Sequence, residues 1–196
     1  LATGAKRFQL PEEFNYINIY KDLAKQQNSY GEQALAELTQ VFENRRQYDV
    51  AAEYLRESIK RFGAGANNHK RDRLNQIAGN WGRFEPLSVQ PAGKGGTVEF
   101  RFRNGKKVQF EAQAIKVDKL LEDVKTFLKS RPKRLEWDQI NISELGYRLV
   151  TKNQTQYLGE KVANWSVDLE PREKHFDKRV TITTPLQKPG AYLLTG

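Results

Sequence analysis

Hydrophobic positions in the first third of the chain recur every three or four residues. Leu35, Leu38 and Phe42 follow this spacing, and so do Ala51 and Leu55 a little further on. Such a period places each set on one face of an α-helix. The pattern therefore predicts two amphipathic helices whose apolar faces pack together.

The end of the second helix is also marked in the sequence. Gly63 and Gly65 follow it, and Lys60 and Arg61 occupy its last turn, where the helix dipole favours cations. Only residues 44–49 separate the two patterns, which indicates an antiparallel helical hairpin. Further helical patterns flank it at 12–28 and 68–79.

This hairpin resembles one tetratricopeptide repeat, a unit of about 34 residues. Leu35 stands where the family has Trp, and Gly63 falls where Pro is usual. A single repeat cannot bury its own face, so the flanking helices would supply the neighbours; a generic helical hairpin is the alternative. The resemblance implies a packing or interaction surface rather than a catalytic centre. The positions in the repeat frame are Leu35, Leu38, Thr39, Phe42, Tyr48, Ala51 and Leu55.

The period changes to two from Trp81 onward. Val98, Phe100 and Phe102 alternate with charged residues, and a second alternating run contains Val108 and Phe110. A three-residue loop with Gly105 in a left-handed bulge would pair Val108 with Phe100 and Phe110 with Val98, which keeps apolar residues on one face. We expect this hairpin, and its one-sided apolar face requires a second layer.

Two helical stripes interrupt the strand pattern at about 117–160. Asp118 is the expected N-cap of the first helix, and Pro132 ends it. We interpret this pair as an insertion that covers a β-sandwich. The first stripe is Leu120, Leu121, Val124, Phe127 and Leu128, and the second is Ile142, Leu145 and Leu149.

The strand pattern resumes with alternating Trp165, Val167 and Leu169. Further on, residues 188–191 fit a type II turn with Pro189 second and Gly190 third. Tyr192 then begins an apolar strand, as in a tyrosine corner, where a phenol bonds nearby backbone at a crossover between sheets; an ordinary core tyrosine is the alternative. The expected strands are 83–89, 96–103, 107–115, 161–169, 177–184 and 190–195.

These patterns predict an α+β protein with a helical, tetratricopeptide-like domain at 1–80 and an antiparallel, immunoglobulin-like β-sandwich at 81–196. From Trp165 to Leu194 the chain resembles a macroglobulin-type module of the bacterial alpha-2-macroglobulin family, and residues 79–86 resemble its opening strands. The resemblance implies a seventh strand, which should follow Gly196, and an open or covered edge beside 190–195. The matching positions are Trp165, Val167, Leu169, His175, Phe176, Val180, Thr181, Ile182, Pro185, Leu186, Gly190, Tyr192, Leu193 and Leu194.

The family resemblance implies protease trapping by a large envelope protein, periplasmic or secreted. In many members a bait loop is cleaved and a Cys-Gly-Glu-Gln thioester captures the protease. This chain contains no Cys, and no bait stretch is evident. We therefore expect a non-catalytic scaffold segment, without metal or cofactor, whose partners are other domains of the same chain and, for the whole protein, proteases.

Composition leaves two other functions open. The net charge is +9, yet residues 1–62 are neutral and the excess is spread over the remainder. A basic nucleic-acid-binding module is thus the weakest hypothesis, and a peptide-binding adaptor built on the helices is the second. No apolar run approaches the roughly 20 residues of a membrane span. The only histidines, His69 and His175, lie far apart without Cys, which argues against a zinc site.

Overall fold

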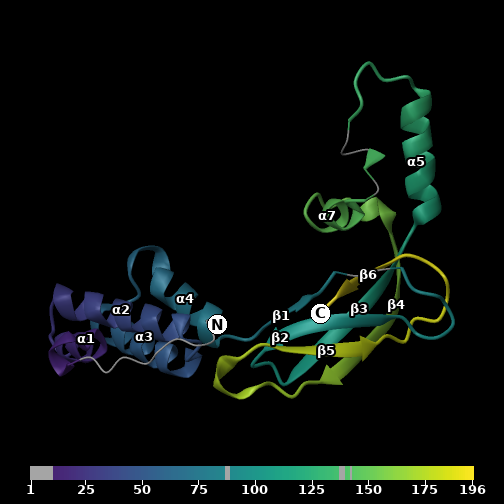
Figure 1. Ribbon diagram of the computed structural model, residues 1–196. Helices are drawn as coiled ribbons and strands as arrows, with labels where there is room; N and C mark the ends of the chain where they lie inside the picture. The colour runs from purple at the N-terminus through teal and green to yellow at the C-terminus, as the bar shows by residue number, and fades with distance from the viewer. Residues whose placement is uncertain (1–10, 87–88, 137–139, 142) are drawn as a thin grey trace. The chain divides into compact units, whose positions relative to one another are not determined.

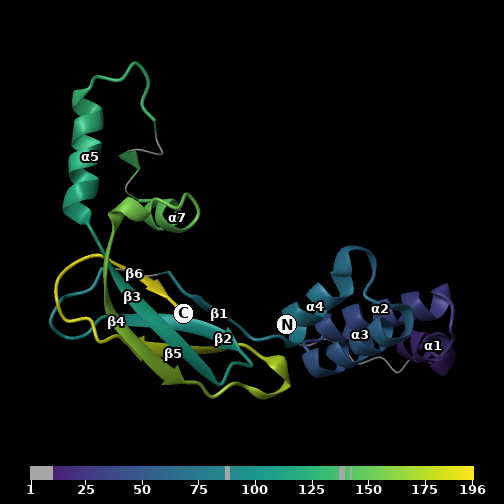
Figure 2. The same ribbon diagram turned by 180° about the vertical axis from the view of Figure 1, so that it is seen from behind.

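The protein is a mixed α+β structure, seen here in a computed structural model that describes residues 11–86, 89–136, 140–141 and 143–196. These residues form six α-helices and two antiparallel three-stranded sheets (Figures 1 and 2). The chain divides into two compact units. The first comprises the residues up to Trp81 with Phe102–Asn104 and Pro171–Lys178, and the second contains the rest.

The first unit is built on four helices that pack in chain order. They are α1 (Tyr16–Leu23), α2 (Ser29–Asn44), α3 (Tyr48–Phe62) and α4 (His69–Ala78). The helical hairpin expected from the apolar spacing is confirmed as α2 and α3. Asn28 begins α2 by accepting a hydrogen bond from Gly31 N, and Gly63 ends α3 with a φ of 80°.

The predicted apolar residues form the core between these helices. Leu35 and Leu38 are fully buried together with Ala34 and Ala24. Phe42 is half-buried and stacks on Tyr54, with ring centroids 5.5 Å apart. Ala51 and Leu55 are buried on α3, where Leu55 packs with Ile77 of α4.

The strands occur in the two sheets in the orders β1-β2-β5 and β4-β3-β6. Each of the six expected strands is present, with shifted ends; residues 87–88 of the first expected strand lie outside the described part. The bounds are β1 Trp81–Phe84, β2 Thr97–Arg103, β3 Lys107–Ile115, β4 Leu158–Asp168, β5 Lys178–Thr183 and β6 Tyr192–Thr195.

The expected hairpin between β2 and β3 is wrong, because these strands belong to different sheets. Val108 pairs with Val167, and Phe110 pairs with Trp165 of β4. Phe110 instead meets Phe100 ring to ring, with centroids 5.2 Å apart at 88°. The apolar face of β2 therefore packs against β3, the next strand along the chain.

The loop between β2 and β3 has the expected length but not the expected conformation. Its left-handed residue is Asn104, with a φ of 58°, rather than Gly105. The Asn104 Nδ2 group donates to the carbonyl oxygens of Ala78 and Gly79, at 2.9 and 3.0 Å. These bonds secure Asn104 in a conformation that asparagine tolerates better than most residues.

The insertion between β3 and β4 contains α5 (Val117–Lys129) and α7 (Leu145–Val150). Leu120 of α5 packs with Leu149 of α7 and Tyr157, so the insertion has a small core of its own. Figures 1 and 2 place α5 beyond the end of the strands, so the expectation that the insertion covers the sheets is wrong. Asp118 is not the N-cap either, because the helix begins at Val117 after Lys116. Ile142 lies outside the described residues.

Candidate functional site at the edge of the second sheet

Strand β6 lies at the edge of its sheet and pairs with β3 alone. Leu194 lies opposite Ala112, and Tyr192 opposite Ala114. Ile115 N donates to Ala191 O at 2.8 Å, so Ile115 and Ala191 form a hydrogen-bonded pair of the ladder. Antiparallel bonds alternate, so the peptide groups of Tyr192 and Leu194 point away from β3. Within the described residues no strand covers them, so this edge can accept another strand.

The turn before β6 is held by its tyrosine. The Tyr192 Oη donates a 2.9 Å hydrogen bond to the carbonyl oxygen of Lys188, four residues upstream. The expected type II turn is wrong, since Gly190 does not have the positive φ that this turn requires. The phenol packs closely against Gly190, where a Cβ would lie only 3.2 Å from Tyr192 Oη.

A groove of about 590 Å³ opens beside β6. Residues 89–92, 96–98, 184, 186 and 188–192 line it together with Leu194. Most of these residues are apolar or small, and Lys188 is the one charged residue among them. The groove and the free edge are adjacent, so an extended chain bound at the edge could place side chains in the groove.

Trp165 lies on β4, away from this groove, and packs beside Phe110 of the same sheet. Its ring centroid is 5.4 Å from that of Phe110, which also contacts Phe84 and Phe100. The Trp165 Nε1 is buried and has no hydrogen-bond partner in the described structure. The predicted Trp165 is therefore a packing residue, whereas Pro189, Gly190 and Tyr192 gather at the groove.

The predicted helical residues Leu35, Leu38, Ala51 and Leu55 are all buried within the first unit and present no surface to a ligand. Burial raises the pKa of Tyr54, and Glu57 and Glu53 add to this rise, so this phenol remains neutral.

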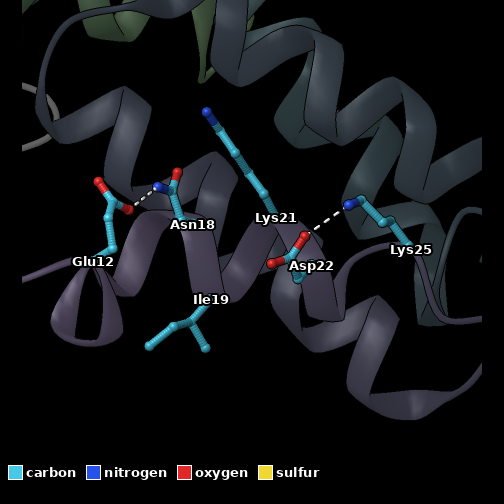
Figure 3. Close-up of a pocket in the computed structure, with 6 residues that line it drawn as sticks. All are labelled: Glu12, Asn18, Ile19, Lys21, Asp22 and Lys25. Carbon is cyan, nitrogen blue, oxygen red and sulfur yellow. Dashed lines mark hydrogen bonds and ion pairs between the residues drawn. The ribbon is translucent and has the colours of Figure 1, made fainter.

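The first unit has an open hollow of about 490 Å³ on α1 (Figure 3). Two of its polar contacts are internal: Asn18 Nδ2 donates to Glu12 at 2.7 Å, and Lys25 pairs with Asp22 at 2.7 Å. Figure 3 shows Lys21 and Ile19 directed to opposite sides of α1. The lining side chains do not converge on one point, so they do not form a site for a small ligand.

His175 is the histidine with a perturbed environment. Its Nδ1 lies 3.0 Å from Asn104 Oδ1, and because that oxygen can only accept, Nδ1 carries the hydrogen. Burial lowers the pKa of His175, Arg56 lowers it further, Asp49 opposes the shift, and Arg103 contributes to it. The imidazole is therefore neutral at pH 7.

Arg103 is an important residue that the sequence did not reveal. Its Nε and Nη2 both lie 2.7 Å from Asp177 Oδ1, and its guanidinium stands 5.5 Å from the rings of both Tyr48 and Trp81. Its Nη1 donates to Gln76 O at 2.5 Å. In the sequence Arg103 is one of the charged residues that alternate with Val98, Phe100 and Phe102, and no local signal points to partners so distant in the chain.

The described residues contain neither a cluster of metal ligands nor a membrane span. No group of three or more His, Asp or Glu side chains there is placed to hold a metal ion. Among the same residues, no helix is long and apolar enough to cross a membrane. Phe100, Phe102 and Phe110 are buried, so nucleic-acid bases cannot stack on them.

Comparisons with protein-family models, with curated proteins and with solved structures found no match to this chain. Its function must therefore be argued from the edge strand, the turn and the groove.

Proposed function

We propose that this chain is a non-catalytic scaffold segment of a large protease-trapping protein of the alpha-2-macroglobulin type. In this proposal the two sheets form a macroglobulin-like β-sandwich, and the helices form a tetratricopeptide-like domain before it. The hydrogen bond from Tyr192 to Lys188 O is the observation that carries the proposal. A tyrosine in that position, at the start of a strand, is the arrangement of a tyrosine corner.

The packing between the sheets also supports the proposal. Phe84 and Phe100 of one sheet meet Phe110 of the other, and Trp165 continues this aromatic layer. Consecutive strands β2 and β3 lie in different sheets. Sandwich modules commonly have such connections, because each sheet hides its apolar face against the other.

In this proposal the edge of β6 is where the scaffold binds another part of the same large chain. An incoming strand of the same large chain would bond the outward peptide groups of Tyr192 and Leu194 and place alternate side chains in the adjacent groove. The segment then contributes geometry and rigidity, while cleavage and capture of proteases occur in other parts of the whole protein. A periplasmic, cell-envelope or secreted location belongs to the same proposal.

A second candidate is an adaptor that binds a peptide or protein through the helical unit. Exposed aromatic and aliphatic residues on α1, on α2 and just before α1 favour this function, namely Phe14, Tyr16, Ile19 and Tyr30. Exposed large apolar side chains are enriched at interaction surfaces when they form a patch. Further 34-residue helical repeats upstream in the reading frame would favour this candidate over the first.

The full reading frame and the whole protein test the proposal together. We expect further strand-rich modules downstream, and we expect the whole protein to protect large protein substrates from an added protease while small peptide substrates are still cleaved. The control is the same protein after heat denaturation. A reading frame that ends near Gly196, or a whole protein without effect on any protease, would contradict the proposal.

A further inference from the structure

Helix α5 carries an apolar stripe that the rest of the described chain leaves largely uncovered. Leu120 is its only buried residue. Leu121 is 37% exposed and Leu128 is 47% exposed, with half-buried Val124 between them in the helical period. Leu135, which follows the helix, is 48% exposed. A continuous apolar surface of this kind on a protein marks an interaction site.

A basic cluster, Lys129, Arg131, Lys133 and Arg134, lies at the C-terminal end of this stripe. All four side chains are exposed, and none has an ion-pair partner among the described residues. Arg131 adopts a φ of 50° and Pro132 follows, so the chain leaves the helix here. All four charges therefore lie within a few residues of the helix end. The positive charge of this region is therefore concentrated at one end.

The acidic residues of α5 do not cancel this cluster. Glu122 is paired with Lys125 at 3.2 Å, and Asp123 with Lys119 at 3.5 Å. Asp118 lies in the first turn, at the opposite end of the helix from the cluster. Glu136, which follows Leu135, makes an interaction of its own, so the charges left for a partner near the exposed leucines are mainly cationic.

We propose that α5 and the basic cluster form a docking surface for an anionic phospholipid membrane. The helix would lie in the plane of the interface, with Leu121, Val124 and Leu128 directed into the acyl boundary and the basic cluster on the headgroup phosphates. A one-sided apolar stripe beside Lys and Arg is what such interfacial helices require. Because one face of α5 is polar, the helix rests on the membrane and does not cross it.

An anionic membrane fits this surface better than a folded protein partner. The exposed leucines and the cationic cluster are adjacent, and a lipid interface offers apolar chains beside phosphates without requiring a complementary shape. Each basic side chain near such a surface strengthens the binding, and inserted leucines strengthen it further. The expected binding is reversible and needs both parts of the surface. This inference does not depend on the proposed function.

Vesicle sedimentation with the full 196-residue chain tests the proposal. We expect binding to vesicles of equimolar phosphatidylcholine and phosphatidylglycerol, and little binding to phosphatidylcholine alone. Binding should weaken as salt rises from about 0.05 to about 0.5 M, because salt screens the phosphate contacts. The double variants Leu121→Gln/Leu128→Gln and Lys133→Glu/Arg134→Glu should each reduce the affinity by at least about tenfold.

The matched control is Lys106→Glu/Lys107→Glu, which makes the same charge change at exposed residues outside the insertion. This control should bind within about twofold of the unsubstituted chain, and circular dichroism should confirm that each variant is folded. Several results would overturn the proposal: no binding to the anionic vesicles, equal loss in the control, or no effect of the leucine variant. Leucine-dependent self-association without vesicle binding would assign the surface to a second copy, and the same basic residues binding single-stranded DNA but not vesicles would assign it to nucleic acid.

Discussion

Arg61 belongs to α3 in sequence but stabilises the end of α1. Its Nη1 donates to Ala24 O and its Nη2 to Gln26 O, each at 2.6 Å. Ala24 is the C-cap of α1 and Gln26 lies just beyond it, so these bonds satisfy carbonyl groups at and after the helix end that would otherwise depend on water. The dipole argument from sequence explained a cation at this position but did not identify the helix that it serves.

Replacement of Arg61 by lysine should destabilise the helical unit by about 1–3 kcal/mol, because one ammonium cannot reproduce the guanidinium fork that reaches both carbonyl oxygens. Urea unfolding followed by circular dichroism measures this change. The neighbouring Lys60 is exposed, and Lys60→Ala is the control, with an expected change below about 0.5 kcal/mol. Equal effects of the two substitutions would contradict the assigned role.

His175 should make the stability of the first unit depend on pH. Its pKa is lowered in the folded state, chiefly by burial. The unfolded chain therefore binds a proton more readily, so this contribution to stability is fully present above about pH 6.5 and is lost as the pH falls through the folded-state pKa. The free energy of unfolding should decrease between pH 7 and pH 5.

The variant His175→Asn isolates this contribution. His175 has a φ of 60°, a conformation that asparagine tolerates, so the substitution removes the titrating group with little backbone strain. Its unfolding free energy should change less between pH 7 and pH 5 than that of the unsubstituted chain. Parallel pH profiles for the two proteins would show that His175 does not titrate differently on unfolding.

At the scale of elements, the turn before β6 gives a direct prediction. Tyr192→Phe removes the hydroxyl that bonds Lys188 O and leaves the ring in place. We expect a loss of about 0.5–1.5 kcal/mol, typical of one hydrogen bond, and faster hydrogen exchange in residues 188–195. Tyr30→Phe, at a tyrosine that is 67% exposed, is the matched control. No difference between the two variants would indicate that the Tyr192 bond does not hold the turn.

The sequence predicted elements well and their partners poorly. Apolar spacing identified α2, α3 and the strands because a buried face imposes its period on the chain. The alternation around Phe100 and Phe110, however, is the same whether two strands pair edge to edge or pack face to face. Only the fold decides between these arrangements, and here it places the strands in different sheets.

The candidate site likewise combines residues that the sequence pattern predicted with residues that it did not. Tyr192 and Gly190 were recognisable because a turn and a strand meet within a few residues. The groove beside them also needs residues 89–92 and 96–98 and Leu186, which are brought together only by the folded chain. Likewise Asn104 and Arg103 gave no sign of their bonds to α4, since carbonyl partners carry no sequence signal.

At the scale of the whole molecule, the two compact units make a prediction about segment 171–178. This segment comes directly before β5 in sequence, yet it belongs to the helical unit. Phe176 packs on Tyr48 at 5.3 Å, and Asp177 is paired with Arg103. These contacts lie within the first unit, so the stability of the segment should follow the helices.

Hydrogen exchange in two matched core-truncation variants tests whether the helices or the sheets stabilise segment 171–178. Leu38→Ala in α2 and Ile182→Ala in β5 each remove a buried side chain, at an expected cost of about 2–5 kcal/mol. Leu38→Ala should speed exchange in the helices and in residues 171–178, and leave β3 and β4 protected. Ile182→Ala should speed exchange in the strands and leave the helices and residues 171–178 protected. If segment 171–178 responds only to Ile182→Ala, it belongs energetically to the sheets, because exchange reports the cooperative unit in which an amide is protected.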